Sequence, residues 1–359
     1  MSSSVALPAA KPRLHGLDYL RGLAALGIMV YHYTTWTWGE HTPSSFLGRV
    51  GIYGVAIFYV LSGITLGYIY ASQLTLSKAD LVSFYTKRFF RIFPLLWLAT
   101  VVSILLSKHA PNILDLLLNL TGLFGLFKWN TYFATGAWSI GNELTFYLVF
   151  PLLVFLLRKS KFVALAVLVI PVLLFLYFAF YSLQADKALA GQWHSYTNPL
   201  NQLALFVGGV VLGRFVNPSS IRARHSLLAG IVGFGLFILV PVIGGSSALV
   251  VGFTRVVLSI ICILLGYSFF RTARAPVFLD KPLALLGQAS YSLYLLHPIV
   301  YAVSKAAFTI LNQISRGNRI VVNNYILIIA QIIASLVVSY FSYRYFERYF
   351  IRMGHHQKP

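Results

Sequence analysis

The sequence is poor in cysteine, in acidic residues and in charge altogether. Its 359 residues include one cysteine, Cys262, and eight Asp and Glu against 28 Lys and Arg. A single cysteine excludes an intrachain disulfide and a zinc site built from several cysteines. Charged residues make up 10% of the chain, whereas they make up roughly 25% of soluble domains. These shortages exclude an ordinary soluble protein and indicate that lipid is the main solvent.

Long apolar runs fill most of the chain. Hydrophobic residues reach 58%, aromatic residues 16%, and the mean hydropathy is +0.77. About 20 apolar residues are needed to cross about 30 Å of hydrocarbon. We therefore predict an all-α, polytopic membrane bundle that forms a single domain over 1–359, with about ten transmembrane helices. They are expected near 17–38, 50–72, 88–107, 139–158, 162–183, 201–216, 226–244, 250–270, 284–309 and 320–346.

The apolar stretch 113–127 is short for a span, and we expect it to be re-entrant or interfacial. Apolar residues begin only at Leu17, so we expect no cleavable signal peptide.

The net charge of +20 is better explained by membrane topology than by nucleic-acid binding. If the N-terminus is cytoplasmic, twenty of the 28 Lys and Arg fall on the cytoplasmic side, six fall outside, and two lie within spans. This asymmetry predicts an even number of spans with both termini cytoplasmic, as tails 1–16 and 350–359. The basic loops would also contact anionic membrane lipids.

Ionisable side chains inside predicted spans cost about 2.5 kcal/mol or more each, so they are candidates for function. They are Asp18, Arg21, His32, Glu143, Arg255, His297 and Lys305. Arg21 and His32 are eleven residues apart on the first predicted helix. Eleven residues make about three turns and about 16 Å, so the two side chains share a face. Asp18 lies one turn before Arg21, on a nearby face.

Three titratable side chains are expected at similar depth, namely His32, Glu143 and His297. An imidazole beside a carboxylate can act as a general base, because the carboxylate orients the ring. Alternatives stay open at this point. Glu143 can instead pair with Arg255, and His297 can bond a backbone group freed by Pro298. A metal held by the three side chains is conceivable, but we expect none.

The segment 85–97 contains a second group of basic residues. Lys87, Arg88 and Arg91 open the third predicted helix at the cytoplasmic face. They can anchor the topology, or Arg88 and Arg91, one turn apart, can clamp phosphates. Ser62 and Gly63 on the second helix allow a close helix approach or a break.

Six segments together resemble the acyltransferase-3 family of membrane acyltransferases. That family has Arg or Lys, ten residues, then His, as Arg21 and His32 have here. The segments, which cover essentially the whole chain, are LDYLRGLAALGIMVYH (17–32), FYVLSG (58–63), KRFFRIFPLLWLA (87–99), WSIGNELTFYLVFP (138–151), LGQASYSLYLLHP (286–298) and YRYFER (343–348). The departures from the family are Ile64 after Ser62 and Gly63, and Tyr349 after Arg348, where Pro is common.

The resemblance implies a ten-helix enzyme of the bacterial inner membrane that moves an acetyl or other short acyl group. The donor would be acyl-coenzyme A, and the acceptor a hydroxyl of a surface or exported glycan, which can be lipid-linked. His32 would be the base, with Arg21 and Glu143 in the catalytic site. The donor would be held by Arg88 and Arg91, and we add Lys87, Ser62 and Gly63. Supporting residues are expected to be Asp18, Trp138, His297 and Arg255.

Some relatives carry an additional extracytoplasmic esterase-like domain, and because this chain stops at Pro359 we expect the stand-alone form. The oligomeric state is left open, a homodimer being one form. The rival class is a transporter or flippase for a lipid-linked glycan, in which the buried charges would line a substrate path.

Overall fold

The computed structural model describes residues 13–107, 110–271, 274–314 and 323–356. Within these residues every regular element is a helix and none is a strand, which confirms the all-α prediction. The elements are α1 (His15–Trp38), α2 (Phe46–Tyr70), α3 (Lys78–Ser107), α4 (Ile113–Thr121), α5 (Phe124–Phe127), α6 (Ala137–Lys159), α7 (Lys161–Tyr177), η1 (Phe178–Ser182), η2 (Leu189–Gln192), α8 (Trp193–Thr197), α9 (Pro199–Phe215), η3 (Pro218–Ser220), α10 (Ala223–Leu239), η4 (Ser246–Leu249), α11 (Gly252–Phe269), α12 (Val277–Gln288), α13 (Ser290–Ile314), α14 (Asn324–Phe341), η5 (Ser342–Glu347) and α15 (Arg348–His356).

In the described part of the chain, seven helices are long and apolar enough to cross a membrane. They are α2, α3, α6, α7 with η1, α11, α13, and the continuous run from α14 through α15. The apolar helices α9 and α10 have 17 residues each, about 26 Å long. The helix α1 has 24 residues and contains Asp18, Arg21 and His32 of the predicted site. Each predicted span therefore coincides with a helix, whereas ten crossings with cytoplasmic termini remain a prediction.

Several helix boundaries differ from those predicted. The third helix begins at Lys78, ten residues before the predicted start, so Lys87 lies inside α3 and does not open it. The predicted span 284–309 is broken at Ala289, between α12 and α13. The break allows α12 to lie against α1, where Gly287 meets the backbone of Asp18. Residues 350–356 belong to α15, while 1–12 and 357–359 lie outside the described residues.

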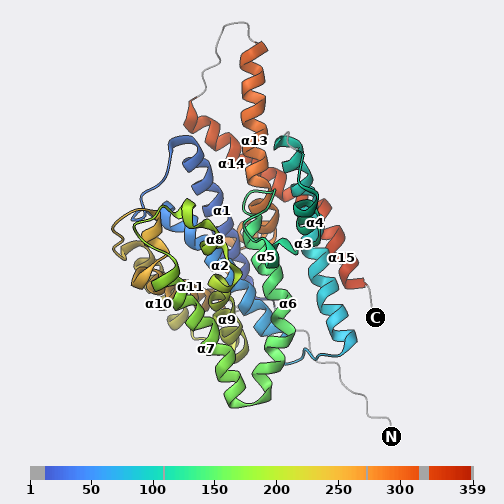
Figure 1. The fold of residues 1–359 in the computed structure, drawn as a ribbon, viewed down its shortest axis with the longest axis vertical. Coiled ribbons are helices and arrows are strands. Elements are labelled where there is room, and N and C mark those ends of the chain that lie inside the picture. Colours follow the sequence, from blue (N-terminus) through green and yellow to red (C-terminus); the bar gives the residue numbers. More distant parts are fainter. Residues whose placement is uncertain (1–12, 108–109, 272–273, 315–322, 357–359) are drawn as a thin grey trace.

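The segment 113–127 forms two short helices, of which α4 is largely exposed and α5 packs against α6. Asn112 caps α4 by accepting a hydrogen bond from the backbone N–H of Leu114, and Gly122, with φ of 74°, ends it. In α5, Phe124 is fully buried, and Gly125 lies against the backbone of Gly141 in α6. Irregular backbone is tolerated at membrane depth only where protein covers it. As a consequence α6 starts within the bundle and not at its surface (Figure 1).

Glycines allow the backbones of α2 and α9 to approach each other closely. A Cβ on Gly63 would collide with the carbonyl oxygen of Phe206, and a Cβ on Gly209 with that of Val60. Small residues that allow backbones to approach are the usual means of joining helices within a membrane. Gly63 is thus explained by helix packing, one of the two roles expected for it.

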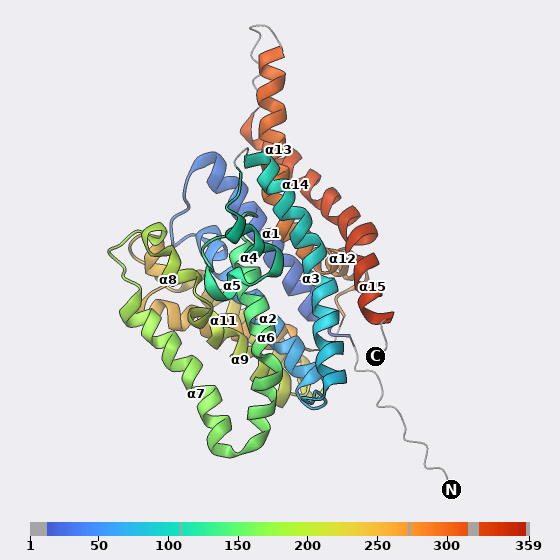
Figure 2. The same ribbon diagram turned by 45° about the vertical axis from the view of Figure 1, so that its right-hand side comes forward.

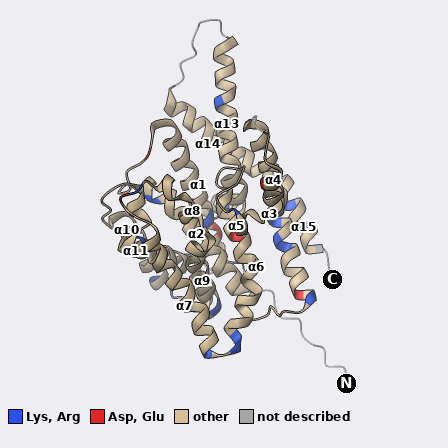
Figure 3. Ribbon diagram, in the orientation of Figure 1, with Lys and Arg blue, Asp and Glu red and all other residues tan. Residues whose placement is uncertain are grey.

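The two ends of the bundle differ in charge and shape. Lys and Arg gather where α6 turns into α7, at Lys159–Lys161, and at the start of α3 (Figure 3). We call this the basic end. At the opposite, far end, α13 extends beyond its neighbours in both views (Figures 1 and 2). The basic end agrees in sign with a cytoplasmic face.

We expect Gly209→Val to destabilise the protein, because its side chain would force α9 away from the Val60 carbonyl. Overpacking of this kind costs about 1–3 kcal/mol, so the melting temperature in detergent should fall and aggregation during gel filtration should rise. Gly235→Val on α10 is the matched control, since no atom lies within 4 Å of its Cβ position. Equal melting temperatures for the two variants would contradict the packing argument.

Candidate active site

A cavity of about 580 Å³ lies among α1, α2, α3, α6, α13, η5 and α15. Its ionisable lining residues are Arg13, Asp18, Arg21, Arg88, Arg91, Glu143, Glu347 and His355. Arg13 at the start of the described chain and His355 near its end both border it. Residues near the two ends of the described chain therefore lie at the same cavity.

On α1, Arg21 is held beside the cavity by Asp18 and Thr65. Its Nη1 lies 3.4 Å from a carboxylate oxygen of Asp18, and its Nη2 donates to the Thr65 hydroxyl at 3.4 Å. Asp18 also pairs with Arg13 at 2.8 Å. The spacing of one helical turn, read from the sequence, brings Asp18 and Arg21 together as expected.

Glu143 faces the same cavity from α6. Its Oε1 accepts hydrogen bonds from the Ser62 hydroxyl at 2.6 Å and from the Tyr147 hydroxyl, four residues further along α6. Ser62 is one turn from Thr65, the partner of Arg21. Glu143 thus lies nearer Arg21 than the predicted depth, similar to that of His32, implied, because α6 begins inside the bundle.

Arg88 and Arg91 border the cavity without a carboxylate partner. Neither forms an ion pair in the described part of the protein. Arg88 donates from Nη2 to the Tyr70 hydroxyl at 3.1 Å and lies over the Tyr147 ring. Its Nε is buried and has no hydrogen-bond partner. A buried, unsatisfied guanidinium N–H is a donor available to an anion.

Glu347 also lines the cavity, although no role was predicted for it from the sequence. This buried carboxylate lies in η5, a π-helical segment, and accepts a hydrogen bond from Ser292. The last predicted span ends at 346, one residue before Glu347. The YRYFER block was the only signal that could have pointed to it. Tyr147, Tyr291 and Tyr294 were missed because tyrosine is common throughout this chain.

His32 and His297 form a hydrogen-bonded pair outside the cavity lining. Nδ1 of His32 lies 2.8 Å from Nε2 of His297, and Nδ1 of His297 lies 2.9 Å from the Leu293 carbonyl oxygen. The expected proximity of the two histidines is confirmed, but Glu143 is not their partner. Tyr294 connects the two parts, since it lines the cavity and its ring lies 6.2 Å from that of His297.

Besides His32 and His297, four more predicted site residues do not line the cavity. Lys87 and Gly63 are absent from its wall, and Trp138 packs against the rings of Trp193 and Tyr196. Arg255 is buried, donates to the backbone and side-chain oxygens of Asn201, and lies 4.5 Å from the ring centre of Phe175. The pairing of Arg255 with Glu143, one of the alternatives from sequence, is therefore wrong. Its partner is a polar neutral side chain at some distance in the sequence, which no charge pattern reveals.

The three candidates for a metal site are not brought together. Glu143 bonds to α2 while the histidines bond to each other, and the described residues hold no group of three His, Cys, Asp or Glu that could bind a metal ion.

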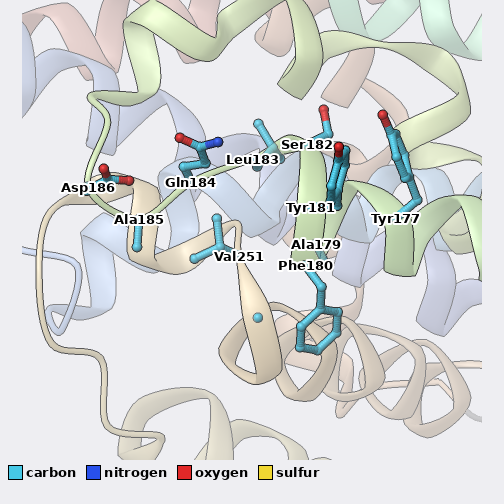
Figure 4. A pocket seen from close by; sticks show the side chains of 11 residues that line it. Tyr177, Ala179, Phe180, Tyr181, Ser182, Leu183, Gln184, Ala185, Asp186 and Val251 are labelled. Carbon is cyan, nitrogen blue, oxygen red and sulfur yellow. The ribbon is translucent and has the colours of Figure 1, made fainter.

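A second hollow, of about 790 Å³, lies where η1 leaves α7 at the far end (Figure 4). Tyr177 and Tyr181 point to one side of η1 and Phe180 to the other (Figure 4). Gln184 and Asp186 complete its wall. It contains none of the predicted site residues, and half-exposed aromatic side chains at a helix end are typical of a membrane interface.

A family model described as an acyltransferase domain matches residues 14–344, which include the histidine pair and all of the cavity lining except Arg13, Glu347, Ile351 and His355. The chain belongs to the acyltransferase-3 family. The family model thus covers nearly all of the described residues. No solved structure gave a significant match.

The chain is also similar to curated proteins named O-acetyltransferase OatA from Staphylococcus aureus. Those of strains NCTC 8325, COL and MRSA252 are each 26% identical over 367 aligned residues. The match covers 93% of this chain and 56% of each relative, so the chain spans about half the length of the relatives it matches.

We expect Arg255→Met to lower stability without affecting the cavity, because it leaves Asn201 buried without its charged donor. Hydrogen bonds to charged groups contribute about 1.5–3 kcal/mol. Thermal unfolding in detergent should show a lower midpoint, while the fraction that remains folded should bind ligand normally. Arg224→Met, exposed on α10, is the control. If Arg255→Met had an unchanged unfolding midpoint but no longer bound ligand, Arg255 would belong to the ligand site and the prediction would be wrong.

Proposed function

We propose that this protein transfers an acetyl or other short acyl group from acyl-coenzyme A to a hydroxyl of a surface or exported glycan. Family membership and the O-acetyltransferase relatives support acyl transfer in general. The observation that carries the donor assignment is the arginine-lined cavity, which contains two guanidinium groups without carboxylate partners.

The cavity suits a phosphorylated donor. Its volume lies within the 300–1,000 Å³ range of sites for small ligands. Arg88 and Arg91 form no ion pair in the described part of the protein, and phosphate oxygens accept strong, charge-assisted hydrogen bonds from arginine. Asp18 already neutralises part of the charge of Arg21. Phosphates are therefore expected at α3, with Arg21 and Thr65 further along the cavity.

His32 is the proposed base. It lies about 16 Å beyond Arg21 along α1, a distance that the extended pantetheine arm of coenzyme A can span. Its ring is partly exposed, and its Nε2 has no hydrogen-bond partner among the described residues. An unpartnered ring nitrogen is free to accept a proton from an acceptor hydroxyl.

In this proposal the basic end faces the cytoplasm, all ten helices cross the bacterial inner membrane, and both termini are cytoplasmic. Acyl-coenzyme A would enter at the basic end, and the glycan, lipid-linked or free, would approach from the far end. The cavity does not support a transporter. A substrate path would continue past the histidine pair, whereas Arg88 and Arg91, the cations without ion pairs, lie on one side of it only.

We expect the double variant Arg88→Ala, Arg91→Ala to bind acetyl-coenzyme A about 10- to 100-fold more weakly for each charge-assisted bond lost, at about 1.5–3 kcal/mol each. The measurement is isothermal titration calorimetry on the protein in nanodiscs. Arg222→Ala with Arg224→Ala, two exposed arginines beside α10, is the matched control. Equal dissociation constants for both double variants would refute the donor site.

We expect His32→Ala to lower acyl transfer by about 100-fold or more, the usual contribution of a general base, while binding of acetyl-coenzyme A persists. Mass spectrometry of surface glycans from cells with and without the protein identifies the acylated product. His225→Ala, an exposed histidine on α10, is the control. Full transfer by His32→Ala at normal expression would rule out this mechanism.

A further inference from the structure

The hydrogen bonds of the histidine pair determine which ring nitrogens carry a hydrogen. The Leu293 carbonyl oxygen can only accept a hydrogen bond, so Nδ1 of His297, at 2.9 Å, must carry a hydrogen. In a neutral imidazole the other nitrogen is then an acceptor. Nε2 of His297 therefore accepts, and Nδ1 of His32, at 2.8 Å, must donate. A neutral His32 is left with its lone pair on Nε2.

The neighbours of the pair hold both rings in this orientation. Trp36, one turn beyond His32 on α1, stacks on the His32 ring at 4.9 Å between centroids and 6° between planes. Tyr33 donates its hydroxyl hydrogen to the His297 carbonyl oxygen at 2.8 Å and lies 2.5 Å from the Ser335 hydroxyl. His297 itself is 1% exposed. A turn of either ring would break the hydrogen bond that joins the two rings.

We propose that His297 is the positioning residue for the base: it accepts the Nδ1 hydrogen of His32 and so keeps the lone pair on the Nε2 of His32. This inference rests on the proposed acyl transfer and names how its base is prepared. A free histidine side chain in water favours the opposite tautomer, with the hydrogen on Nε2, so the base requires a partner that reverses this preference. The backbone carbonyl of Leu293 is the fixed point from which the order of donors and acceptors follows.

The transfer step balances with this tautomer. Nε2 of His32 takes the proton of the acceptor hydroxyl as that oxygen bonds to the thioester carbonyl carbon. The carbon–sulfur bond breaks, its electron pair leaves with the sulfur, and the imidazolium returns the proton to give the coenzyme A thiol. The products are the glycan ester and free coenzyme A. During the step the Nδ1–H bond to His297 becomes charge-assisted and stronger, which stabilises the imidazolium.

The test compares His297→Leu with His297→Gln. Leucine keeps volume but offers no acceptor, whereas the glutamine carbonyl oxygen can accept from Nδ1 of His32. Membrane vesicles that carry the protein and its glycans are given acetyl-coenzyme A labelled in the acetyl group. We expect His297→Leu to lower kcat about 10- to 100-fold, as loss of a ring-orienting partner does elsewhere, with KM unchanged. His297→Gln should recover most of that loss.

A second measurement does not require activity. Nitrogen-15 NMR of histidine-labelled protein in nanodiscs, with His32→Gln to assign the signals, reports which nitrogen of His32 carries the hydrogen. We expect Nδ1 in the native protein and Nε2 in His297→Leu. A native hydrogen on Nε2, full turnover by His297→Leu, or a glutamine variant no better than leucine would each overturn the proposal. If the native protein transferred no labelled acetyl group, the proposed function would fail while the NMR result for the pair remained valid; if His32→Ala retained transfer, only the assignment of His32 as the base would fail.

Discussion

The constraint on which the structure depends is that an ionised side chain in hydrocarbon must be enclosed by protein. The chain has only eight acidic residues, and three of them, Asp18, Glu143 and Glu347, line the arginine cavity. Asp18 is used by Arg13 and Arg21, and the other two bond to hydroxyl groups. The four arginines of the cavity outnumber its three carboxylates, and Arg88 and Arg91 form no ion pair in the described part of the chain. The scarcity of acid noted in the sequence is thus what keeps the cavity positive and suited to an anion.

Departures from regular helix supply the remaining geometry of the cavity. The short helix α5 packs against α6, which begins inside the bundle, where Glu143 bonds to Ser62. Because the helix is broken at Ala289, α13 does not continue along the axis of α12, and its residues Tyr291 and Tyr294 line the cavity. The π-helical turn of η5 places Glu347 opposite Ser292. Such turns occur often at functional sites because an added residue redirects one face of a helix.

The positions of the helices could be predicted because apolar length is a direct consequence of bilayer thickness. Periodicity on one helix also brought Arg21 beside Asp18, and the basic pair of α3 was recognised from its spacing. What failed involved contacts between helices. The position of Glu143 depended on where α6 begins in the bundle, the partner of Arg255 was a neutral Asn201, and Glu347 lay beyond a predicted helix end. Hydropathy contains no information on any of these, since it describes how a helix meets lipid and not which helices meet each other.

The choice of a second histidine as the neighbour of His32 follows from the same charge constraint. A carboxylate in the place of His297 would also orient the ring, as it does in serine hydrolases. It would, however, be a buried negative charge whose possible counter-ion, Arg21, is about 16 Å away along α1, and an unpaired charge there is costly. A neutral imidazole held by the Leu293 carbonyl orients the ring without adding charge. The cations can then remain with the donor, while the uncharged pair receives the proton only during transfer.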